Sequence, residues 1–319
     1  MGMLQSKILI LFLLTFLAPH FLEANSENHE VDGYSDSIIG YEEALVFGLV
    51  EGITEFLPVS STGHLILTNE WIKKPGHIEL SEQEAVNAYL IVIQAGAIFA
   101  VAIIYWRRII SVFLGFLGLD STGRKLGINL ITAFIPAALL GPLLDSWIES
   151  LLFGPIPVAV ALIAGSLLMH WAEKRKMKIE RIGGEAEKGL DDLNLMNSLK
   201  IGLLQCVAMC PGTSRSMMTI VGGYLVGLSR KQSAEFSFLL GLVTLTAAAV
   251  YKGVTSGKVI ISNLAFGPML FGCLIAGISA AVSVRWLVGY LSKNGLGFFV
   301  WYRLALGLIV LVYFGILYP

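Results

Sequence analysis

Two apolar stretches of this chain are each broken near the middle by a short run of proline, glycine and hydroxyl residues. Residues 41–72 are interrupted by FLPVSSTGHL, and residues 198–231 by CPGTSRSMMT. The composition places both stretches in lipid, because only 14% of the residues are charged, against roughly 25% in soluble domains. Non-helical backbone at membrane depth is tolerated only where protein buries it or where it lines a wet cavity. We therefore expect each stretch to form two half-helices that enter and leave the membrane on the same side.

Six further segments are apolar enough, and close enough to the roughly 20 residues that a bilayer demands, to form transmembrane helices. They cover residues 86–106, 127–145, 151–172, 233–252, 264–288 and 299–318. The expected fold class is therefore an all-α polytopic membrane protein with six transmembrane helices and two re-entrant half-helix pairs.

Basic residues predict how these segments are oriented. Arg107, Arg108, Arg124 and Lys125 fall in one loop, a second basic group lies in and around residues 173–197, and the loop at 146–150 has none. Cytoplasmic loops carry the excess of lysine and arginine. With the basic loops in the cytoplasm, the six crossings put residues 25–40 and the C-terminus outside. The first broken segment then enters from outside and the second from the cytoplasm.

The two halves of the chain repeat one pattern. GLVEGITEFLPVSS (48–61) and GLLQCVAMCPGTSRS (202–216) begin alike, and each runs through proline into a hydroxyl cluster. Each is followed by three crossings, and an odd number turns the second copy upside down relative to the first. Such inverted-topology repeats build a site where broken helices meet near the midplane. We expect one repeat over 41–172, a charged cytoplasmic loop over 173–197, and the second repeat over 198–319.

The N-terminal region precedes the first repeat. Residues 1–24 hold one lysine and an apolar run that is short for a spanning helix, which favours a signal peptide over an additional N-terminal helix. Residues 25–40 are polar and form a lead-in.

The first break carries most of the ionisable groups. Glu51 and Glu55 are four residues apart and share one helix face, and Pro58 ends that helix. Ser60, Ser61 and Thr62 can then begin the next half-helix, whose free N–H groups and positive dipole end favour phosphate. His64 follows within a turn and can exchange a proton near neutral pH.

The second break adds a fixed positive charge. Thr213, Ser214, Arg215 and Ser216 follow Pro211-Gly212. A guanidinium group binds phosphate oxygens bidentately and keeps its charge on burial. We expect Arg215 and the hydroxyls beside it to bind phosphate.

A purely structural role for these polar residues is the alternative to a functional one. Serine and threonine in membrane helices often bond only to neighbouring carbonyls. Ionisable residues are different, since each costs about 2.5–3.5 kcal/mol at the bilayer centre. Two carboxylates, a histidine and an arginine at the two breaks therefore indicate a functional site more than a structural ion-pair network. The net charge of −1 gives no basic field, so no nucleic acid partner is expected.

EGITEFLPVSSTGHL and PGTSRSMMTIVGGYLVGLSRKQSAEFSFLL closely resemble the two signatures of the undecaprenyl-diphosphate phosphatase family, the bacitracin-resistance proteins of bacterial membranes. IVIQAGAIFAV (91–101) also resembles the stretch after the first signature, and the similarity spans residues 41–318. The chain departs from the family pattern at Met217 and Met218, where small residues are usual. It departs again at Gly241, where a proline is common, and in the longer charged segment 173–197.

The resemblance implies hydrolysis of undecaprenyl diphosphate to the monophosphate and inorganic phosphate, in the bacterial inner membrane, with the active site facing the periplasm. It implies catalytic roles for Glu51, Glu55, Ser61, His64 and Arg215, and a divalent cation, Mg²⁺ or Ca²⁺, with Glu51 and Glu55 as candidate ligands. The expected partners are the polyprenyl diphosphate and the bilayer, and a homodimer is left open.

Two mechanistic alternatives stay open at this point. Either Ser61 or a water molecule attacks the terminal phosphate, with His64 as general base or acid oriented by Glu55.

The main rival function is transport of the monophosphate lipid, because inverted repeats with broken helices are also a transporter architecture. A non-catalytic membrane scaffold is a third reading that no feature of the sequence favours.

Overall fold

The computed structural model describes residues 39–72, 80–182 and 188–317 of the 319. The expected signal peptide or helix at 1–24 lies outside the described residues, as does all but the end of the lead-in at 25–40. Within the described ranges the chain is helical, and an isolated bridge between Lys188 and Leu228 is the one β-type pairing.

The six predicted spanning helices are confirmed. They are α4 (Leu80–Ile104), α6 (Ser121–Leu152), α7 (Pro155–Arg181), α10 (Arg230–Asn263), α11 (Phe266–Asn294) and α12 (Gly297–Val312). All six have the length and apolar composition to cross a membrane. Their outward faces carry large exposed apolar side chains, among them Phe99, Leu143 and Leu274. This surface suits contact with lipid, because a soluble monomer rarely exposes so large a continuous apolar area.

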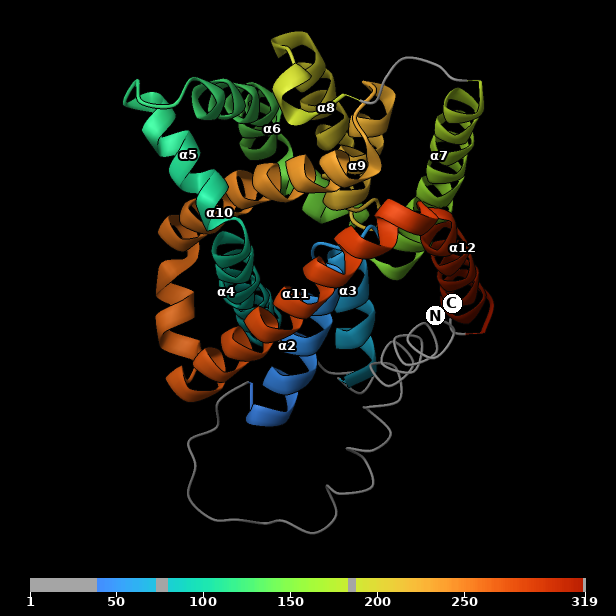
Figure 1. Cartoon of the computed structure of the whole chain (residues 1–319). Coiled ribbons are helices and arrows are strands. Elements are labelled where there is room, and N and C mark those ends of the chain that lie inside the picture. The colour runs from blue at the N-terminus through green and yellow to red at the C-terminus, as the bar shows by residue number, and fades with distance from the viewer. Residues whose placement is uncertain (1–38, 73–79, 183–187, 318–319) are drawn as a thin grey trace.

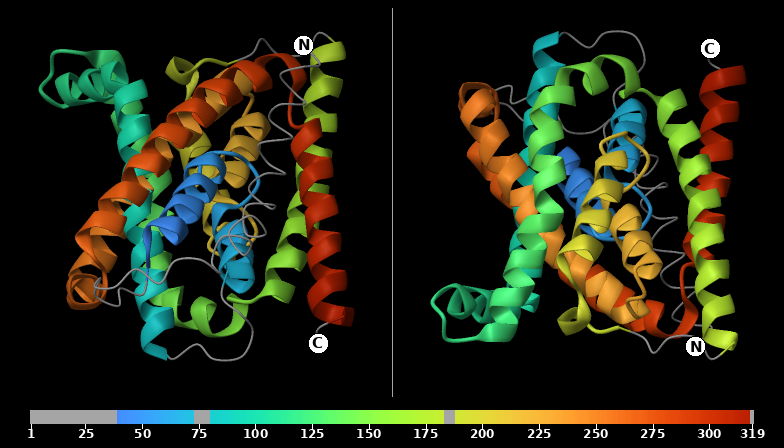
Figure 2. Two further views of the ribbon diagram at one scale, coloured as in Figure 1. Left: turned by 90° about the horizontal axis from the view of Figure 1, so that it is seen from below. Right: turned by 90° about the horizontal axis from the view of Figure 1, so that it is seen from above.

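Four short helices lie in the middle of the molecule (Figures 1 and 2). α2 (Tyr41–Thr54) and α3 (Ser61–Ile72) come from the first broken stretch, and α8 (Leu195–Val207) and α9 (Arg215–Leu225) come from the second. At 1.5 Å per residue the longest of them is about 21 Å, short of the roughly 30 Å hydrocarbon core. That each pair enters and leaves on one side of the membrane stays a prediction.

The two breaks have the same backbone geometry. Ser60 and Ser214 have φ values of 77° and 76°, in the left-handed region that non-glycine residues rarely adopt. Each serine precedes a half-helix, and its Oγ accepts from the N–H three residues on, at 3.2 Å from both Gly63 and Met217. The side-chain cap offsets part of the backbone strain. The repeat predicted from the sequence is therefore also present in the local backbone structure.

Packing between the halves also follows a repeat. The first short helix of each half packs on the second spanning helix of the other, α2 on α11 and α8 on α6. Gly48 and Gly202, which open the two repeated sequences, permit this contact. A Cβ at Gly48 would lie 2.7 Å from the Gly272 oxygen, and one at Gly202 would lie 2.2 Å from the Ala133 oxygen. The other spanning helices pack against their counterparts in the other half, α4 against α10 and α7 against α12 (Figure 2). These reciprocal contacts are the pattern expected of two halves related by a two-fold axis.

Several boundaries differ from the sequence expectations. The loop after α4 contains a further helix, α5 (Trp106–Phe116), which packs on α6. Its turn into α6 is fixed by Asp120, which accepts from the Gly123 N–H at 2.9 Å and from Ser111. These bonds hold the pKa of Asp120 below its usual range. The residues at 146–150, expected to form a loop, continue α6 to Leu152.

The charged segment at 173–197 is only partly a loop. Its first nine residues extend α7 to Arg181, because helix formers rich in lysine and glutamate continue the pattern beyond the apolar run. Its later part is tied to the turn after α9, where the Lys188 N–H donates to the Gly227 oxygen at 3.1 Å.

Candidate functional site

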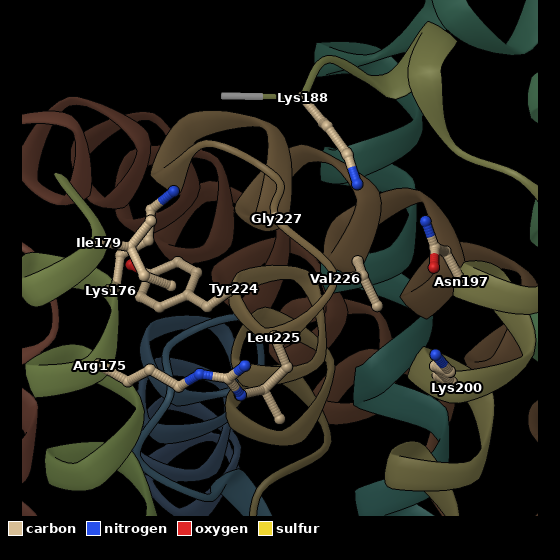
Figure 3. Close-up of a pocket in the computed structure, with 10 residues that line it drawn as sticks. All are labelled: Arg175, Lys176, Ile179, Lys188, Asn197, Lys200, Tyr224, Leu225, Val226 and Gly227. Carbon is tan, nitrogen blue, oxygen red and sulfur yellow. The ribbon is translucent and has the colours of Figure 1, made fainter. Parts of the chain in front are cut away.

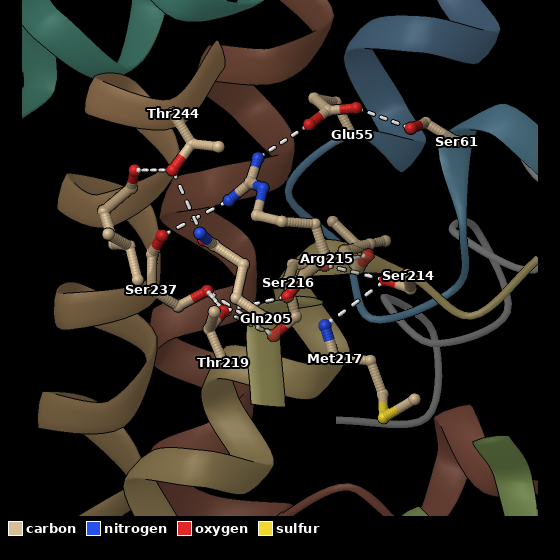
Figure 4. A network of polar contacts seen from close by, with 12 residues as sticks. Glu55, Ser61, Gln205, Ser214, Arg215, Ser216, Met217, Thr219, Ser237 and Thr244 are labelled. Carbon is tan, nitrogen blue, oxygen red and sulfur yellow. Dashed lines mark hydrogen bonds and ion pairs between the residues drawn. The ribbon is translucent and has the colours of Figure 1, made fainter. Parts of the chain in front are cut away.

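The two breaks meet through Arg215 and Glu55. Arg215 is the first residue of α9, and its Nη2 donates to Oε1 of Glu55, directly after α2, at 2.6 Å (Figure 4). Nη1 donates to the Ser237 oxygen on α10 at 3.2 Å, and the guanidinium carbon lies 5.2 Å from the centre of the Phe56 ring. The guanidinium is therefore held on three sides, which fixes its direction.

Gly241 on α10 makes room for this arginine. A Cβ at that position would lie 2.0 Å from Nη1 of Arg215, far inside van der Waals contact. The departure from the family pattern noted at Gly241 is thus compatible with the site, because glycine leaves room for the guanidinium in its observed position.

Glu55 also accepts from Ser61. Ser61 Oγ donates to Oε2 of Glu55 at 2.5 Å, a length typical of strong charge-assisted hydrogen bonds. One carboxylate therefore joins a hydroxyl from the first break to the guanidinium from the second. The arrangement can lower the cost of removing the serine proton, because the acceptor is already in place.

A polar cavity of about 140 Å³ opens at this junction. The predicted site residues that line it are Glu55, Ser60, Ser61, Thr62, Ser214 and Arg215. α3 begins at Ser61 and α9 at Arg215, so the N-terminal ends of both half-helices are directed toward the cavity region. Their free N–H groups and dipoles, with the guanidinium, favour an anion there.

The remaining hydroxyls of the second motif hold the structure together instead. Ser216 Oγ donates to the Leu57 oxygen of the first break at 2.6 Å, and Thr219 shares a 2.6 Å hydrogen bond with Ser237. Ser216 and the buried Thr213 do not line the cavity. The bond from Ser216 to Leu57 fixes the position of one break against the other.

His64 lies behind the cavity wall. Its Nδ1 is 2.6 Å from the Ser60 oxygen and its Nε2 is 2.6 Å from Tyr302 Oη on α12, with the two rings stacked. A carbonyl can only accept, so Nδ1 carries the hydrogen, and Nε2 of the neutral ring accepts from the tyrosine. The structure does not show Glu55 orienting His64 as expected, because Ser60 and Tyr302 are the hydrogen-bond partners of the two ring nitrogens.

Glu51 is fully buried one helical turn before Glu55, and within the described part of the chain no donor lies within hydrogen-bond distance of either of its carboxylate oxygens. Among the described residues no group of three or more histidine, cysteine, aspartate or glutamate side chains could hold a metal ion. Mg²⁺ is commonly bound by one or two carboxylates together with substrate phosphate oxygens. The residues present therefore fit a cation shared with a phosphorylated ligand better than a complete protein cage.

Sequence reasoning missed two residues of α12 beside the site, Tyr302 and Arg303. Arg303 is 0% exposed and donates to oxygens of both breaks, to Gly212 at 2.9 Å and to Pro58 at 3.4 Å. A third bond reaches Ala161 on α7 at 3.3 Å. An arginine within an apolar span is costly and usually functional, and that rule applied to YRLALGLIV would have found it.

A larger and mainly apolar cavity of about 500 Å³ adjoins the polar one, between α6 and α10. The two share Thr62, Met209 and Arg215. Small side chains line the larger cavity, including Ala138, Gly141 and Ala248, while Asp145 and Lys252 form a 2.7 Å ion pair on its wall. A ligand with a charged head and an apolar tail fits this pair of cavities.

Comparison with known proteins gives a consistent result. Residues 44–309 match the model of the family described as bacitracin resistance protein BacA. Undecaprenyl-diphosphatase 2 of Rhodospirillum rubrum is 43% identical over 269 residues, which are 84% of this chain and 93% of that protein. The undecaprenyl-diphosphatases of Acidovorax ebreus and Nitrosomonas eutropha are each 42% identical, over 85% and 86% of this chain and 93% and 96% of their own lengths.

Proposed function

The chain belongs to the family of bacitracin resistance protein BacA, and from this membership we infer that it hydrolyses undecaprenyl diphosphate to undecaprenyl phosphate and inorganic phosphate. It is a multi-pass membrane enzyme that regenerates the lipid carrier of cell-wall synthesis, the activity that underlies bacitracin resistance. The single observation that supports this function in the chain's own geometry is the chain of contacts from Ser61 through Glu55 to Arg215.

In the proposed mechanism Arg215 and the N-terminal ends of α3 and α9 bind the terminal phosphate in the polar cavity. Ser61 Oγ, or a water molecule in its place, attacks that phosphorus as Glu55 accepts the proton. The bond from phosphorus to the bridging oxygen breaks, and the monophosphate lipid leaves with the electron pair. If a phosphoserine forms, water hydrolyses it and releases inorganic phosphate. Phosphoryl transfer depends mainly on positioning and charge stabilisation.

His64 and Glu51 act from behind the cavity wall in this proposal. His64, oriented by Tyr302, supplies or removes a proton at the leaving or entering oxygen after a small movement toward the cavity. Glu51 would hold a divalent cation, Mg²⁺ or Ca²⁺, with Glu55 on the cavity wall as the second candidate ligand. The cation would neutralise charge on the diphosphate. The lack of a hydrogen-bond donor to either Glu51 oxygen among the described residues supports this role.

The apolar cavity between α6 and α10 is proposed to hold the first isoprenoid units of the tail. Small apolar side chains, among them Ala137, Ala138 and Ala248, line this cavity, which also reaches Arg215. The distribution of basic residues supports a site that faces the outside of a bacterial inner membrane. A homodimer also remains a proposal.

The direct test is phosphate release from undecaprenyl diphosphate by the purified chain in detergent, with and without a chelator. Arg215→Ala should remove activity, whereas Lys174→Ala, an exposed cation at the far end of α7, should leave it unchanged. Equal turnover by both variants would remove Arg215 from the mechanism.

A further inference from the structure

A second polar cavity lies at the opposite end of α9 from Arg215 (Figure 3). It measures about 420 Å³ and lies between α7, α8 and the turn that follows α9. Four cationic side chains line it, and its described lining contains no carboxylate. The polar or charged lining residues are Arg175, Lys176, Lys188, Asn197, Lys200 and Tyr224.

Two of the four cations are explained by the fold. Lys176 is 6% exposed and donates to the Leu228 oxygen at 3.0 Å. The backbone of Lys188 is hydrogen-bonded to the same turn. Its side chain lies next to Gly227, since a Cβ added there would be 3.5 Å from it. Both stand at the C-terminal end of α9, where exposed carbonyls favour positive charge. They fix the turn after α9.

The other two cations have no such explanation. Arg175 on α7 and Lys200 on α8 are exposed, and within the described part of the chain neither forms an ion pair. Figure 3 shows Arg175 reaching toward Leu225 from one side of the cavity, with Asn197 and Lys200 on the other. Like charges gathered in one concave site repel one another, and a bound anion removes that cost.

The position of the cavity suits a ligand at the membrane surface. Arg175 stacks on Trp171, 5.8 Å from its ring centre, and exposed tryptophans of this kind mark the level of the lipid headgroups. α9 separates this cavity from the catalytic one, because Arg215 and Leu225 are its two ends, about 15 Å apart at 1.5 Å per residue. The two cavities are therefore separate.

We propose that this cavity is a second anion site that binds a phosphate-bearing group, with Arg175 and Lys200 on opposite sides of the phosphate and Asn197 as a hydrogen-bond donor. Guanidinium and ammonium groups bind phosphate oxygens through charge-assisted hydrogen bonds. Basic pockets between helices at the cytoplasmic side of membrane proteins commonly accept lipid phosphates. The phosphate can come from an anionic phospholipid headgroup or from a soluble phosphate.

The test uses the purified full chain and two charge-matched double variants. Arg175→Gln with Lys200→Gln removes the two unexplained cations. Lys174→Gln with Lys178→Gln removes two exposed cations of α7 that do not line the cavity. Native mass spectrometry compares the binding of phosphatidylglycerol and phosphatidylcholine with identical acyl chains. In a separate arm, inorganic phosphate is titrated against thermal unfolding.

If the phosphate belongs to a lipid, wild type and the Lys174/Lys178 variant bind phosphatidylglycerol in preference to phosphatidylcholine. In the Arg175/Lys200 variant the ratio of the two affinities falls by about tenfold or more. For the soluble source, the lipid preference is absent, and phosphate stabilises wild type and the control more than the Arg175/Lys200 variant. Phosphate bound at Arg215 contributes equally to all three chains. Equal responses of the two double variants, or no response of wild type to either probe, would overturn the proposal. Retained hydrolysis of undecaprenyl diphosphate shows that both variants are folded.

Discussion

Arg215 and Glu55 are 160 residues apart in the sequence, yet Nη2 of the arginine lies 2.6 Å from Oε1 of the carboxylate. Their side chains are only 12% and 5% exposed. Removing one partner of such a buried pair leaves the other charge uncompensated, at a cost of about 3–5 kcal/mol. The pair therefore joins the two halves of the molecule and also aligns the groups that we propose for catalysis.

Replacing Arg215 separates these two roles. Arg215→Ala should destabilise the protein and abolish phosphate release, because Glu55 loses its partner and the phosphate its ligand. Arg215→Lys keeps the charge and should recover part of the stability, yet remain at least about a hundredfold less active because an ammonium cannot bind Glu55 and phosphate in the same planar geometry. Thermal unfolding and phosphate release are measured on both. Full activity of the lysine variant would show that charge alone is sufficient.

Gly241→Ala tests the packing around the same guanidinium. The added methyl would overlap Nη1 of Arg215, so the arginine must move, and we expect a higher KM and a loss of about 1–3 kcal/mol in stability. The matched control is Gly253→Ala on the same helix, where a Cβ meets nothing within 4 Å. That change should be neutral or slightly stabilising, since alanine favours helix over glycine. Equal kinetics in the two variants would contradict the proposed position of Arg215.

The choice between serine and water as nucleophile can be decided at Ser61. Ser61→Ala should lower kcat by about a thousandfold or more if the serine is the nucleophile. It should lower kcat only about tenfold if the hydroxyl merely supports Glu55 through one hydrogen bond. Rapid quench with substrate labelled in the terminal phosphate gives an independent answer, because label trapped on Ser61 identifies a phosphoserine. Thr62→Ala, beside it on the cavity wall, is the control.

Tyr302→Phe probes the support of His64. The variant keeps the stacked ring but removes the hydroxyl that lies 2.6 Å from Nε2. We expect kcat to fall and the pH–rate profile to change with little effect on KM, because neither residue lines the polar cavity. The stability should fall by only about 1 kcal/mol, the usual value of one hydrogen bond. An unchanged profile would exclude His64 from proton transfer under this mechanism.

Much of the fold follows from local properties of the sequence. The six spans are readable because crossing lipid requires long apolar helices, and the two breaks are readable because proline and hydroxyl clusters interrupt such helices. The sequence analysis does not predict α5, since 11 residues are too few to span and Arg107 and Arg108 indicate a cytoplasmic loop. The ends of α6 and α7 were placed too early because polarity marks where a span leaves the lipid, and a helix can continue beyond that point.

The candidate site was predictable in its residue types but not in its contacts. Ionisable groups at a break stand out wherever they occur, which is why Glu55 and Arg215 were found. The contact between His64 and Tyr302 joins residues that are 238 positions apart in the sequence. Local sequence patterns cannot predict a contact of this kind. Arg303 was overlooked because its partners are backbone oxygens, and a search for complementary side-chain charges does not detect such partners.

The cation proposal rests on Glu51, whose two buried oxygens receive no hydrogen bond from any residue that the structure describes. Chelation should abolish phosphate release, and added Mg²⁺ or Ca²⁺ should restore it. Glu51→Gln preserves the shape of the side chain but removes its charge. We therefore expect the cation concentration for half-maximal activity to rise at least about tenfold, since even residues that only support metal ligands cost 10–100-fold in affinity. The control is Glu42→Gln, an exposed carboxylate in the first turn of the same helix, which should leave the titration unchanged. If Glu51→Gln lowers the maximal rate at every cation concentration without shifting the midpoint, the carboxylate acts in proton transfer or structure and does not bind the ion.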